Sequence, residues 1–452
     1  MNNLNNLPRE LLGEVVNSLF VNEAISLGKA NKYFLNNLSR TDFGYHFTDP
    51  IPLKVVLDVQ NKFTKRLYVV GNFTSFEVTC LNDLIHLPTE TKSVFFDINF
   101  NEVIPPGIML FPSHVRRITF GPRFNQSLDN IQLPPQLLHL GLGFIFNKSI
   151  DKLKLPACLE QLEFGSKFEQ PIPNNWLKSA SLTHLTLGKT IDIGNLQLPS
   201  SLTYLKFGTF FNQSVNNLKL PSSLTHLVFG AWFDQPIDHL KLPPYLTHLS
   251  FQHSFNQSIN NLTLPPLLKQ LQFSFSFNQP VDNLKLPPML THLDMGGRFN
   301  QSVDNLVLPP SLIHLSFGVD FDQSVDNLKL PPLITHFRFG YSFNQPIDKI
   351  KFPHSLTHLT FGSYFNQSVD NIEFPSELTH LTFGNYFNQS IDNLKLPPKL
   401  THLTFGHGFD KSLENFNLNP PLTHLTYGKY YNHPLNLASL SHLTIRHLLL
   451  HE

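Results

Sequence analysis

The sequence predicts an α+β protein that is mostly β: a parallel β solenoid of about 15 coils, preceded by a small helical domain. Three observations predict this fold. A Phe-Asn or Phe-Asp pair returns along most of the chain at intervals that are almost always 22 residues. Each 22-residue unit contains one short run in which apolar and polar residues alternate. Proline precedes that run and glycine follows it, and these residues typically mark the ends of a strand.

The alternating run of each unit predicts a half-buried strand. In one unit Leu227 and Phe229 alternate with His226 and Val228, so the leucine and the phenylalanine are expected to point inward. Each coil offers about seven apolar side chains to the interior, each contributing roughly 1.5–3 kcal/mol when it is buried. A single coil leaves both faces of this layer exposed to water. The units are therefore expected to fold only as a stack, in which their strands form a parallel sheet.

The corners of each coil are predicted from glycine, proline and asparagine. Gly230 follows the strand and permits a turn that a β-carbon would hinder. A Pro-Pro pair such as Pro287-Pro288 lacks ladder donors, so no strand is expected to cross it. Asn300 and Asp304 stand at the other corners, where such side chains can bond turn amides. Stacked from coil to coil, these residues are expected to form polar ladders. The sequence leaves open whether the return segment forms a second sheet.

The chain divides into four predicted segments. They are a helical domain (1–45), a linker and N-terminal cap (46–88), the repeat solenoid (89–443) and a C-terminal cap or tail (444–452). The first segment has a helical period, because apolar residues recur at spacings of three and four after Pro8. About 40 residues are too few for an independent core, so the helical domain is expected to need a partner or the solenoid end.

Composition excludes several classes of partner. The 33 basic and 33 acidic residues give a formal net charge of zero, so neither nucleic acid nor an anionic membrane surface is an expected partner. The sequence contains no apolar run long enough for a membrane span and no signal peptide. Cys80 and Cys158 are far apart, which is typical of a reducing compartment. A cytoplasmic or nuclear location is expected, with no cofactor.

A stripe of histidines is expected on the outward face of the sheet. It consists of His139, His184, His226, His248, His292, His314, His336, His358, His380, His402 and His424. Metal binding is not expected, because side chains standing parallel on a sheet do not converge on one point. Catalysis is not expected either, because equivalent residues lack a distinct partner that tunes their pKa. The stripe is interpreted as structural, and charging it below about pH 6.5 is expected to weaken the sheet.

The recurring carboxylates favour a structural role over catalysis. An enzyme remains an alternative, since parallel β-helix hydrolases and lyases have coils of similar length. Such an enzyme would need unusual acidic or basic residues clustered on one face. The carboxylates instead recur at the same turn of successive coils: Asp238, Asp282, Asp304, Asp326, Asp370 and Asp392. The sequence therefore predicts no catalytic residues and no metal site.

The string from Leu7 to Leu38 resembles an F-box, with the motif L-P-R-E-L-L-G-E-V-V-N-S-L at its start. In that family the Leu-Pro pair and the following apolar helix positions dock onto the Skp-type adaptor of cullin-RING ubiquitin ligases. The resemblance implies six adaptor-binding residues: Leu7, Pro8, Leu11, Val15, Leu19 and Leu27. The chain departs from the family at the third helix, where many F-boxes place tryptophan and this chain has Tyr33-Phe34. A helical cap without an adaptor is the alternative.

The repeats resemble the FNIP repeat, here most often written F-N-Q-S/P-I/V-D-N. FNIP repeats are similar to leucine-rich repeats and occur in amoebae and in the giant viruses that infect them, often behind an F-box. The combination implies a substrate-recruiting subunit of a cullin-RING ligase of the SCF type, whose repeats hold an unknown target protein. A viral member would act in the host cytoplasm. A protein-interaction scaffold without a ligase role is the second hypothesis.

Two outward positions vary between copies and are the predicted target-binding surface. One lies on the strand between the inward leucine and phenylalanine, and the other lies in the turn after the glycine. Exposed tryptophan, tyrosine and arginine are favoured anchors of protein interfaces. The predicted contact residues are Lys206, Phe210, Trp232, Gln272, Asp294, Arg298, Asp320, Arg338, Tyr364 and Tyr386. The alternative for the aromatic residues is that they cover the turn of the next coil.

Overall fold

A computed structural model describes residues 51–52, 75–105, 111–129, 131–173, 175–189, 193, 196–414, 421–434 and 443–447. This described part contains 19 β-strands, one α-helix and one 3-10 helix. The chain forms two compact units, Met1–Leu202 and Thr203–Glu452, which are called unit 1 and unit 2. The helical domain predicted for residues 1–45 lies outside the described residues.

Unit 1 contains a parallel sheet in which each strand pairs with the next one along the chain. Its strands are β1 (Ile51–Pro52), β2 (Ser75–Val78), β3 (Ser93–Phe96), β4 (Arg117–Thr119), β5 (His139–Gly141), β6 (Gln161–Glu163) and β7 (His184–Thr186). Helix α5 (Leu81–Ile85) follows β2, and the 3-10 helix η2 (Trp176–Ser179) lies between β6 and β7.

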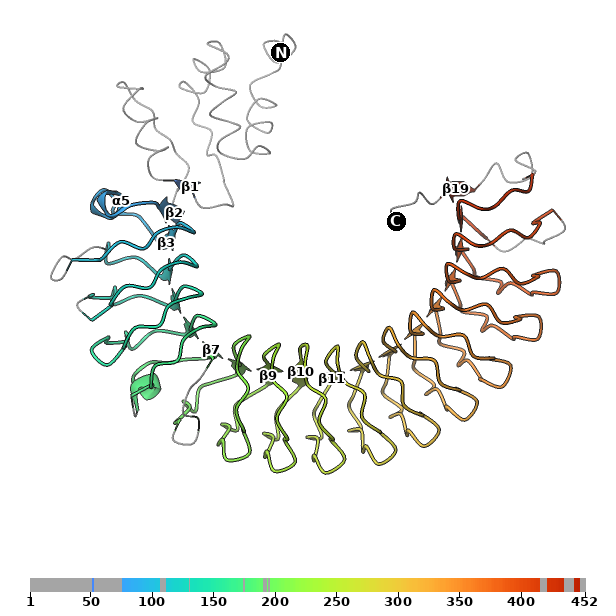
Figure 1. Cartoon of the computed structure of the whole chain (residues 1–452), viewed down its shortest axis with the longest axis horizontal. Coiled ribbons are helices and arrows are strands. Elements are labelled where there is room, and N and C mark those ends of the chain that lie inside the picture. The colour runs from blue at the N-terminus through green and yellow to red at the C-terminus, as the bar shows by residue number, and fades with distance from the viewer. Residues whose placement is uncertain are drawn as a thin grey trace, which may run out of the picture. The chain divides into compact units, whose positions relative to one another are not determined.

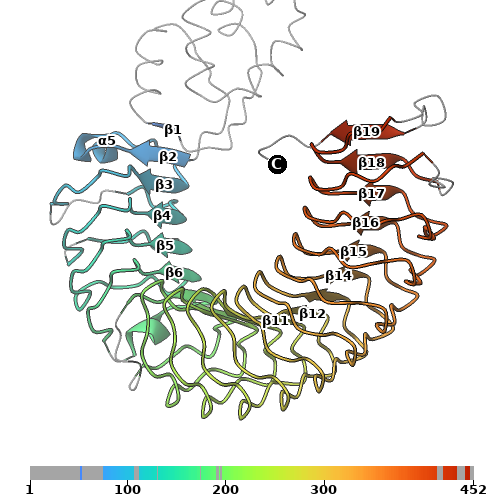
Figure 2. The same ribbon diagram turned by 45° about the vertical axis from the view of Figure 1, so that its right-hand side comes forward.

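Unit 2 repeats the same parallel pairing over twelve strands. They are β8 (Tyr204–Lys206), β9 (His226–Phe229), β10 (His248–Phe251), β11 (Gln270–Gln272), β12 (His292–Asp294), β13 (His314–Ser316), β14 (His336–Arg338), β15 (His358–Thr360), β16 (His380–Thr382), β17 (His402–Thr404), β18 (His424–Tyr427) and β19 (Thr444–His447). Within unit 2 the strands follow the inner side of an arc and the return segments follow its outer side (Figures 1 and 2). The outward face of this sheet is therefore concave.

The predicted parallel β solenoid is confirmed. In β9 the side chains of Leu227 and Phe229 are buried, whereas His226 and Val228 are partly exposed. Strands β9 and β10 pair with Leu227 opposite Leu249 and Phe229 opposite Phe251, a step of one 22-residue unit. The alternation of the sequence thus fixes the register, because a slip by one residue would expose every leucine.

The return segments contain tight turns and, among the described residues, no strand. In one coil the amides of Phe233, Leu240 and Leu246 each donate to a carbonyl three residues earlier. The first turn begins at Gly230, the second spans the corner from Ile237 to Leu240, and the third begins at Pro243, the first residue of the proline pair. The described coils therefore carry strands on one side only, which answers the question that the sequence left open.

The core is built around two columns of stacked phenylalanine rings. The rings of Phe233 and Phe255 lie 6.0 Å apart between their centroids, and those of Phe229 and Phe251 lie 5.0 Å apart. The two columns meet within each coil, where the rings of Phe229 and Phe233 are 4.3 Å apart. Each layer thus contacts its neighbours above and below, which explains why one coil has no stable core of its own.

An asparagine ladder runs along the corner after the phenylalanine column, as the sequence predicted. The side-chain Oδ1 atom of Asn366 accepts the backbone N–H of Asn388 in the next coil at 2.8 Å. The Nε2 atom of Gln389 donates to the same oxygen at 3.1 Å. Asp234 and Asp322 replace asparagine in this ladder and accept in the same way. Each side chain thus satisfies a turn amide of the following coil.

Replacing Asn366 with alanine is expected to lower the free energy of unfolding by about 1–3 kcal/mol, because the amide of Asn388 loses its acceptor. Asn366→Asp is the matched control, since Asp322 already serves this position. Urea denaturation followed by circular dichroism measures both variants. Equal destabilisation by alanine and aspartate would contradict the acceptor role.

The sheet extends beyond the predicted solenoid bounds of 89 and 443. Strand β2 lies in the predicted cap (46–88) and pairs with β3 through Ser75 and Ser93. Strand β19 lies in the predicted tail (444–452) and pairs with β18 through His424 and Thr444. Neither step is 22 residues. Pairing requires only an extended run beside a free strand edge, whereas the sequence bounds were drawn from the period of the repeat.

Candidate functional site

The concave face of unit 2 carries three columns of side chains, one residue per coil. The histidine column is the first outward residue of each strand, such as His292. The variable column lies two residues further, at Asp294. The rim consists of the two residues after the glycine position, such as Tyr341 after Gly340. Parallel strands in register place each column in a line.

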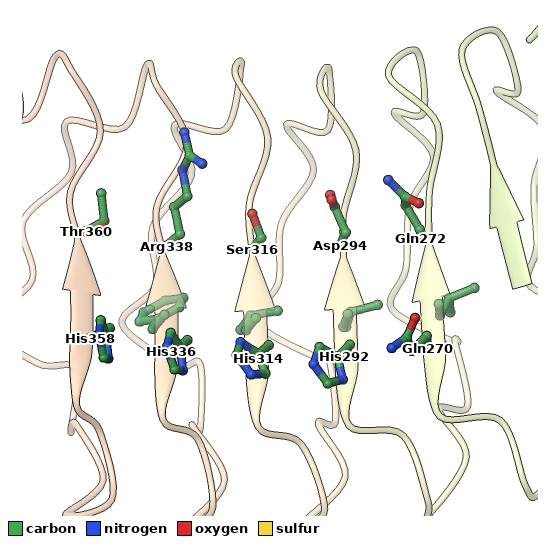
Figure 3. A pocket seen from close by; sticks show the side chains of 14 residues that line it. Gln270, Gln272, His292, Asp294, His314, Ser316, His336, Arg338, His358 and Thr360 are labelled. Carbon is green, nitrogen blue, oxygen red and sulfur yellow. The ribbon is translucent and has the colours of Figure 1, made fainter. Parts of the chain in front are cut away.

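A groove of about 450 Å³ lies on this face, over strands β11 to β15 (Figure 3). Three predicted target-binding residues line it together: Gln272, Asp294 and Arg338. The rest of its polar lining comes from the same two columns: Gln270, His292, His314, Ser316, His336, His358 and Thr360. The leucines and the phenylalanine of the intervening strand positions form its floor.

Asp294 and Arg338 give the groove a charge of each sign. They lie two coils apart, with Ser316 between them in the variable column. Burial raises the pKa of the Asp294 carboxyl above its ordinary value, while the N–H of Gly296 and the charge of Arg338 oppose that shift. The carboxylate also accepts the Gly296 N–H at 3.0 Å. Asp294 is therefore held in place by the turn that follows its strand.

Several departures from the repeat lie at this groove. Lys269 and Gln270 replace the usual Thr-His pair, and Ser274 replaces the glycine after the strand. Ser274 is fully buried and donates from Oγ to the carbonyl of Phe255 at 2.5 Å. In the next coil Gly296 has a φ of +82°, a left-handed conformation that favours glycine. Departures also occur outside the groove, at Tyr204 in the histidine column and at Gln252 in place of the glycine, whereas at the groove they are combined with a charge of each sign.

An aromatic and cationic group lies on the rim beside the groove. The ring of Phe275, 41% exposed, stacks on His253 at 5.3 Å between centroids. The guanidinium of the predicted residue Arg298 lies 5.7 Å from the centroid of Phe275, in a cation–π arrangement. Asp320, also predicted, is exposed in the following coil.

The other predicted target-binding residues lie apart from the groove. Lys206 ends strand β8, and on the rim Phe210 contacts the 61% exposed Trp232 at 5.9 Å between ring centroids. Tyr364 and Tyr386 stack at 4.8 Å in the coils of β15 and β16. These aromatic rings contact one another and also remain exposed to solvent. The six predicted adaptor-binding residues, from Leu7 to Leu27, lie outside the described residues.

Sequence reasoning missed part of this surface. Gln270 and Phe275 were not singled out, although a comparison of copies shows glutamine in the histidine column and phenylalanine on the rim. It also missed an apolar ridge at the edge where the strands begin. The ridge consists of residues that are 39–59% exposed: Tyr245, Leu267, Met289 and Leu333. Their common position, directly before the first buried leucine or isoleucine of a repeat, was the available signal.

The histidine column is fixed by the threonine that precedes most of its members. Thr357 donates from Oγ1 to the carbonyl of Thr335 at 3.0 Å, and its Oγ1 lies 2.9 Å from Nδ1 of His358. The same carbonyl also accepts the backbone N–H groups of Thr357 and His358, each at 2.9 Å. The threonine thus holds the imidazole ring in place through its Nδ1 atom. The same pair of contacts recurs at Thr247, Thr291, Thr379, Thr401 and Thr423.

The imidazole rings stack along the column and are held neutral. The centroids of His358 and His380 lie 4.1 Å apart. Burial, followed by the charges of neighbouring histidines, lowers the pKa of His358 to about 4. Burial likewise lowers the pKa values of His248, His292, His314, His336, His380 and His402. Two stacked imidazolium ions would repel each other, so the column favours the uncharged form.

The recurring carboxylates serve the turns of the return segments. Asp304 accepts from the side chains of Ser302 and Asn327, and Asp282 accepts from Asn305. In the described part of the chain, no group of three or more histidine, cysteine, aspartate or glutamate side chains is arranged to hold a metal ion. Neither helical segment of that part has the length and apolarity of a membrane-spanning helix.

This architecture defines a class: a leucine-rich-repeat-like solenoid whose exposed sheet is suited to protein–protein interaction. The chain belongs to the FNIP repeat family, whose pattern matches residues 100–144, 191–231, 211–254, 233–276, 255–298, 277–320, 321–364 and 365–408.

The solved structures that are similar to this chain include a circular LRR protein and an internalin. CroV588, described as a novel circular LRR protein, is 38% identical over 80% of this chain, with a TM-score of 0.67. The match spans 60% of the CroV588 chain. The internalin InlF of Listeria monocytogenes is 13% identical over 85% of this chain and 99% of its own, with a TM-score of 0.41. No curated protein matches the chain in sequence.

Proposed function

We propose that the chain recruits a target protein to a cullin-RING ubiquitin ligase of the SCF type. The groove over β11 to β15 carries the target-binding half of this proposal, because it combines departures from the repeat with a charge of each sign. A solenoid of identical repeats is stable without residues that depart from the repeat, whereas specific recognition of one partner requires them. Asp294 and Arg338 supply charged contacts, and the apolar ridge supplies anchoring area.

The adaptor half of the proposal is supported by the F-box resemblance of the first residues. Leu7, Pro8 and the apolar positions that follow would dock onto a Skp-type adaptor in the cytoplasm or nucleus. A scaffold that binds the same target without a ligase is the second candidate, and it shares the groove. The two candidates differ only in whether the N-terminal residues bind an adaptor.

Affinity purification of the tagged chain with mass spectrometry is the test. The wild type is expected to recover both a Skp-type adaptor and a target. Leu7→Ala with Pro8→Ala is expected to lose the adaptor and keep the target. Asp294→Ser with Arg338→Thr is expected to keep the adaptor and reduce target recovery at least about tenfold, since the variant loses two charged contacts to the target. Serine and threonine occupy this column in other coils, at Ser316 and Thr360, so the fold should tolerate both.

Thr404→Ser, in the variable column outside the groove, is the matched control and is expected to keep both partners. If the wild type recovers a target but no adaptor, the ligase role is contradicted and the scaffold hypothesis is supported. A groove variant that recovers the target as well as the wild type does would contradict the assignment of the groove.

A further inference from the structure

The groove over β11 to β15 holds two opposite charges that form no ion pair. Asp294 and Arg338 stand on the same side of the histidine column, with Ser316 between them (Figure 3). Neither charge is paired with any residue in the described part of the chain. The Asp294 carboxylate accepts the N–H of Gly296, and the side chain of Arg338 is exposed. Each charge is therefore open to an opposite charge on a ligand.

Asp294 gains most from such a ligand. Its side chain is partly buried, and burial raises the pKa of the carboxyl above its ordinary value. A carboxylate that has lost part of its hydration is stabilised by a cation that approaches it. The charge of Arg338, two coils away, only opposes the shift. A basic side chain of a ligand supplies the direct partner that the chain itself does not.

The spacing of the two charges indicates the conformation of a bound segment. Neighbouring strands lie about 4.8 Å apart, so two coils span roughly 9.6 Å at the backbone. The steps are slightly shorter on the concave side, where the imidazole centroids of His292, His314 and His336 follow one another at 4.3 Å. One turn of polyproline II advances about 9.3 Å in three residues, which places residues i and i+3 on one face. Side chains on one face of an extended strand are about 6.6 or 13 Å apart, and neither distance matches.

The rim beside the groove offers a wall for the prolines of such a segment. The first rim residue is apolar or aromatic in three of these coils: Phe275, Val319 and Tyr341, which are 41%, 43% and 48% exposed. A polyproline II helix has three residues per turn. A segment that turns one face toward Asp294 and Arg338 therefore turns a second face toward this rim. Aromatic-lined grooves are a common binding surface for proline-rich segments.

The other charges near the groove disfavour a ligand of a single sign. They are Lys269 at the edge where the strands begin, and Arg298 and Asp320 on the rim. Because both signs are present, a segment of one sign meets a like charge wherever it lies in the groove. Charge complementarity thus favours a segment that carries both signs.

We propose that the groove binds a linear segment of a target protein in the polyproline II conformation, with a basic and an acidic residue three positions apart and prolines between them. The basic side chain donates to the carboxylate of Asp294, and the acidic side chain accepts from the guanidinium of Arg338. The prolines pack against the rim. This binding mode rests on the target-binding role of the proposed function and specifies the kind of segment that occupies the groove.

Fluorescence anisotropy with the purified full chain measures this binding. The probe is a short labelled peptide in which two prolines separate a lysine from a glutamate, at about pH 7.5 and physiological ionic strength. It is expected to bind at least about tenfold more tightly than peptides with two lysines or two glutamates at the same spacing. Peptides with one or three prolines between the charges, and a peptide with glycines in place of prolines, are expected to bind at least about threefold more weakly.

Two charge-changing variants are expected to switch the specificity. Arg338→Asp gives the groove two carboxylates and should then prefer the peptide with two lysines over the probe, whereas Asp294→Arg should prefer the peptide with two glutamates. Aspartate and arginine each occupy this column in the wild type, so the fold should tolerate both changes. Thr404→Asp, which adds a charge to the same column outside the groove, is the matched control and is expected to keep the wild-type preference.

The outcomes separate this binding mode from the proposed function. If Arg338→Asp and Asp294→Arg keep the wild-type order of preference, or if the respaced peptides bind as tightly as the probe, the binding mode is wrong. If the probe does not bind while Asp294→Ser with Arg338→Thr still loses its target, the groove recognises a folded surface and only the binding mode fails. If the probe binds as expected but the wild type recovers no target, the binding mode is supported and the proposed function fails.

Discussion

Replacing Gly384 with alanine is expected to destabilise unit 2 by about 3 kcal/mol. A β-carbon at this position would overlap the carbonyl oxygen of Gly362 in the preceding coil. That oxygen belongs to the backbone of a packed neighbour, so it cannot rotate away as a side chain would. The clash must be relieved by separating two coils, and neighbouring coils supply most of the stability of a solenoid.

Urea denaturation followed by circular dichroism measures this effect. Ser363→Ala, one residue beyond Gly362 in the same turn, is the control and is expected to change the midpoint little, because its side chain is partly exposed. If the urea midpoint of Gly384→Ala equals that of the wild type, the coils can separate at little cost in free energy and the prediction is wrong. Gln252 and Ser274 occupy the same column, so two coils of unit 2 do accommodate a β-carbon there, whereas the coil of Gly384 packs its glycine directly against the backbone of Gly362.

Lowering the pH from about 7.5 to about 4.5 is expected to lower the melting temperature by more than about 10 °C. The folded state lowers the histidine pKa values, to about 4 for His358. Above the ordinary value of 6.5 both states are neutral and the stability is complete. Below 6.5 the unfolded chain takes up protons first, so stability falls until the folded pKa is reached. Several histidines contribute, because burial lowers their pKa values in the folded state.

A triple variant separates this effect from the titration of carboxylates. His336→Gln with His358→Gln and His380→Gln removes three rings, and Gln270 shows that glutamine fits the column. The variant is expected to lose less stability than the wild type over the same pH range in differential scanning calorimetry. Parallel pH profiles for the two proteins would assign the acid sensitivity to other groups.

The sequence predicted the interior of the solenoid well. Leu227 and Phe229 were placed inward by their alternation with His226 and Val228, and their burial confirms that prediction. The asparagine ladder was also predicted, from the position of Asn300 at a corner. Both follow from local rules, because a two-residue period and a turn residue are visible within one unit. Repetition then extends the result to every similar coil.

The site was predicted only in part. Comparison of copies singled out Gln272, Asp294 and Arg338 within a column, and the structure brings them to one groove. It did not separate them from Lys206 or Trp232, which lie elsewhere on the concave side. A groove depends on which coils adjoin and on the shape that their side chains leave, and neither is visible from the variability of a position.

The sequence by itself determined the coil: its strand, its buried face, its turns and the register between neighbours. Those properties depend on residue types that recur at fixed spacing. Only the tertiary structure decided which side chains of adjacent coils contact each other and how those contacts change their chemistry. Nδ1 of His358 is held by Thr357, which also contacts the preceding coil, and the pKa of His358 is lowered by burial and by the charges of neighbouring histidines. These are contacts between residues about one repeat apart, and they exist only once the coils are stacked.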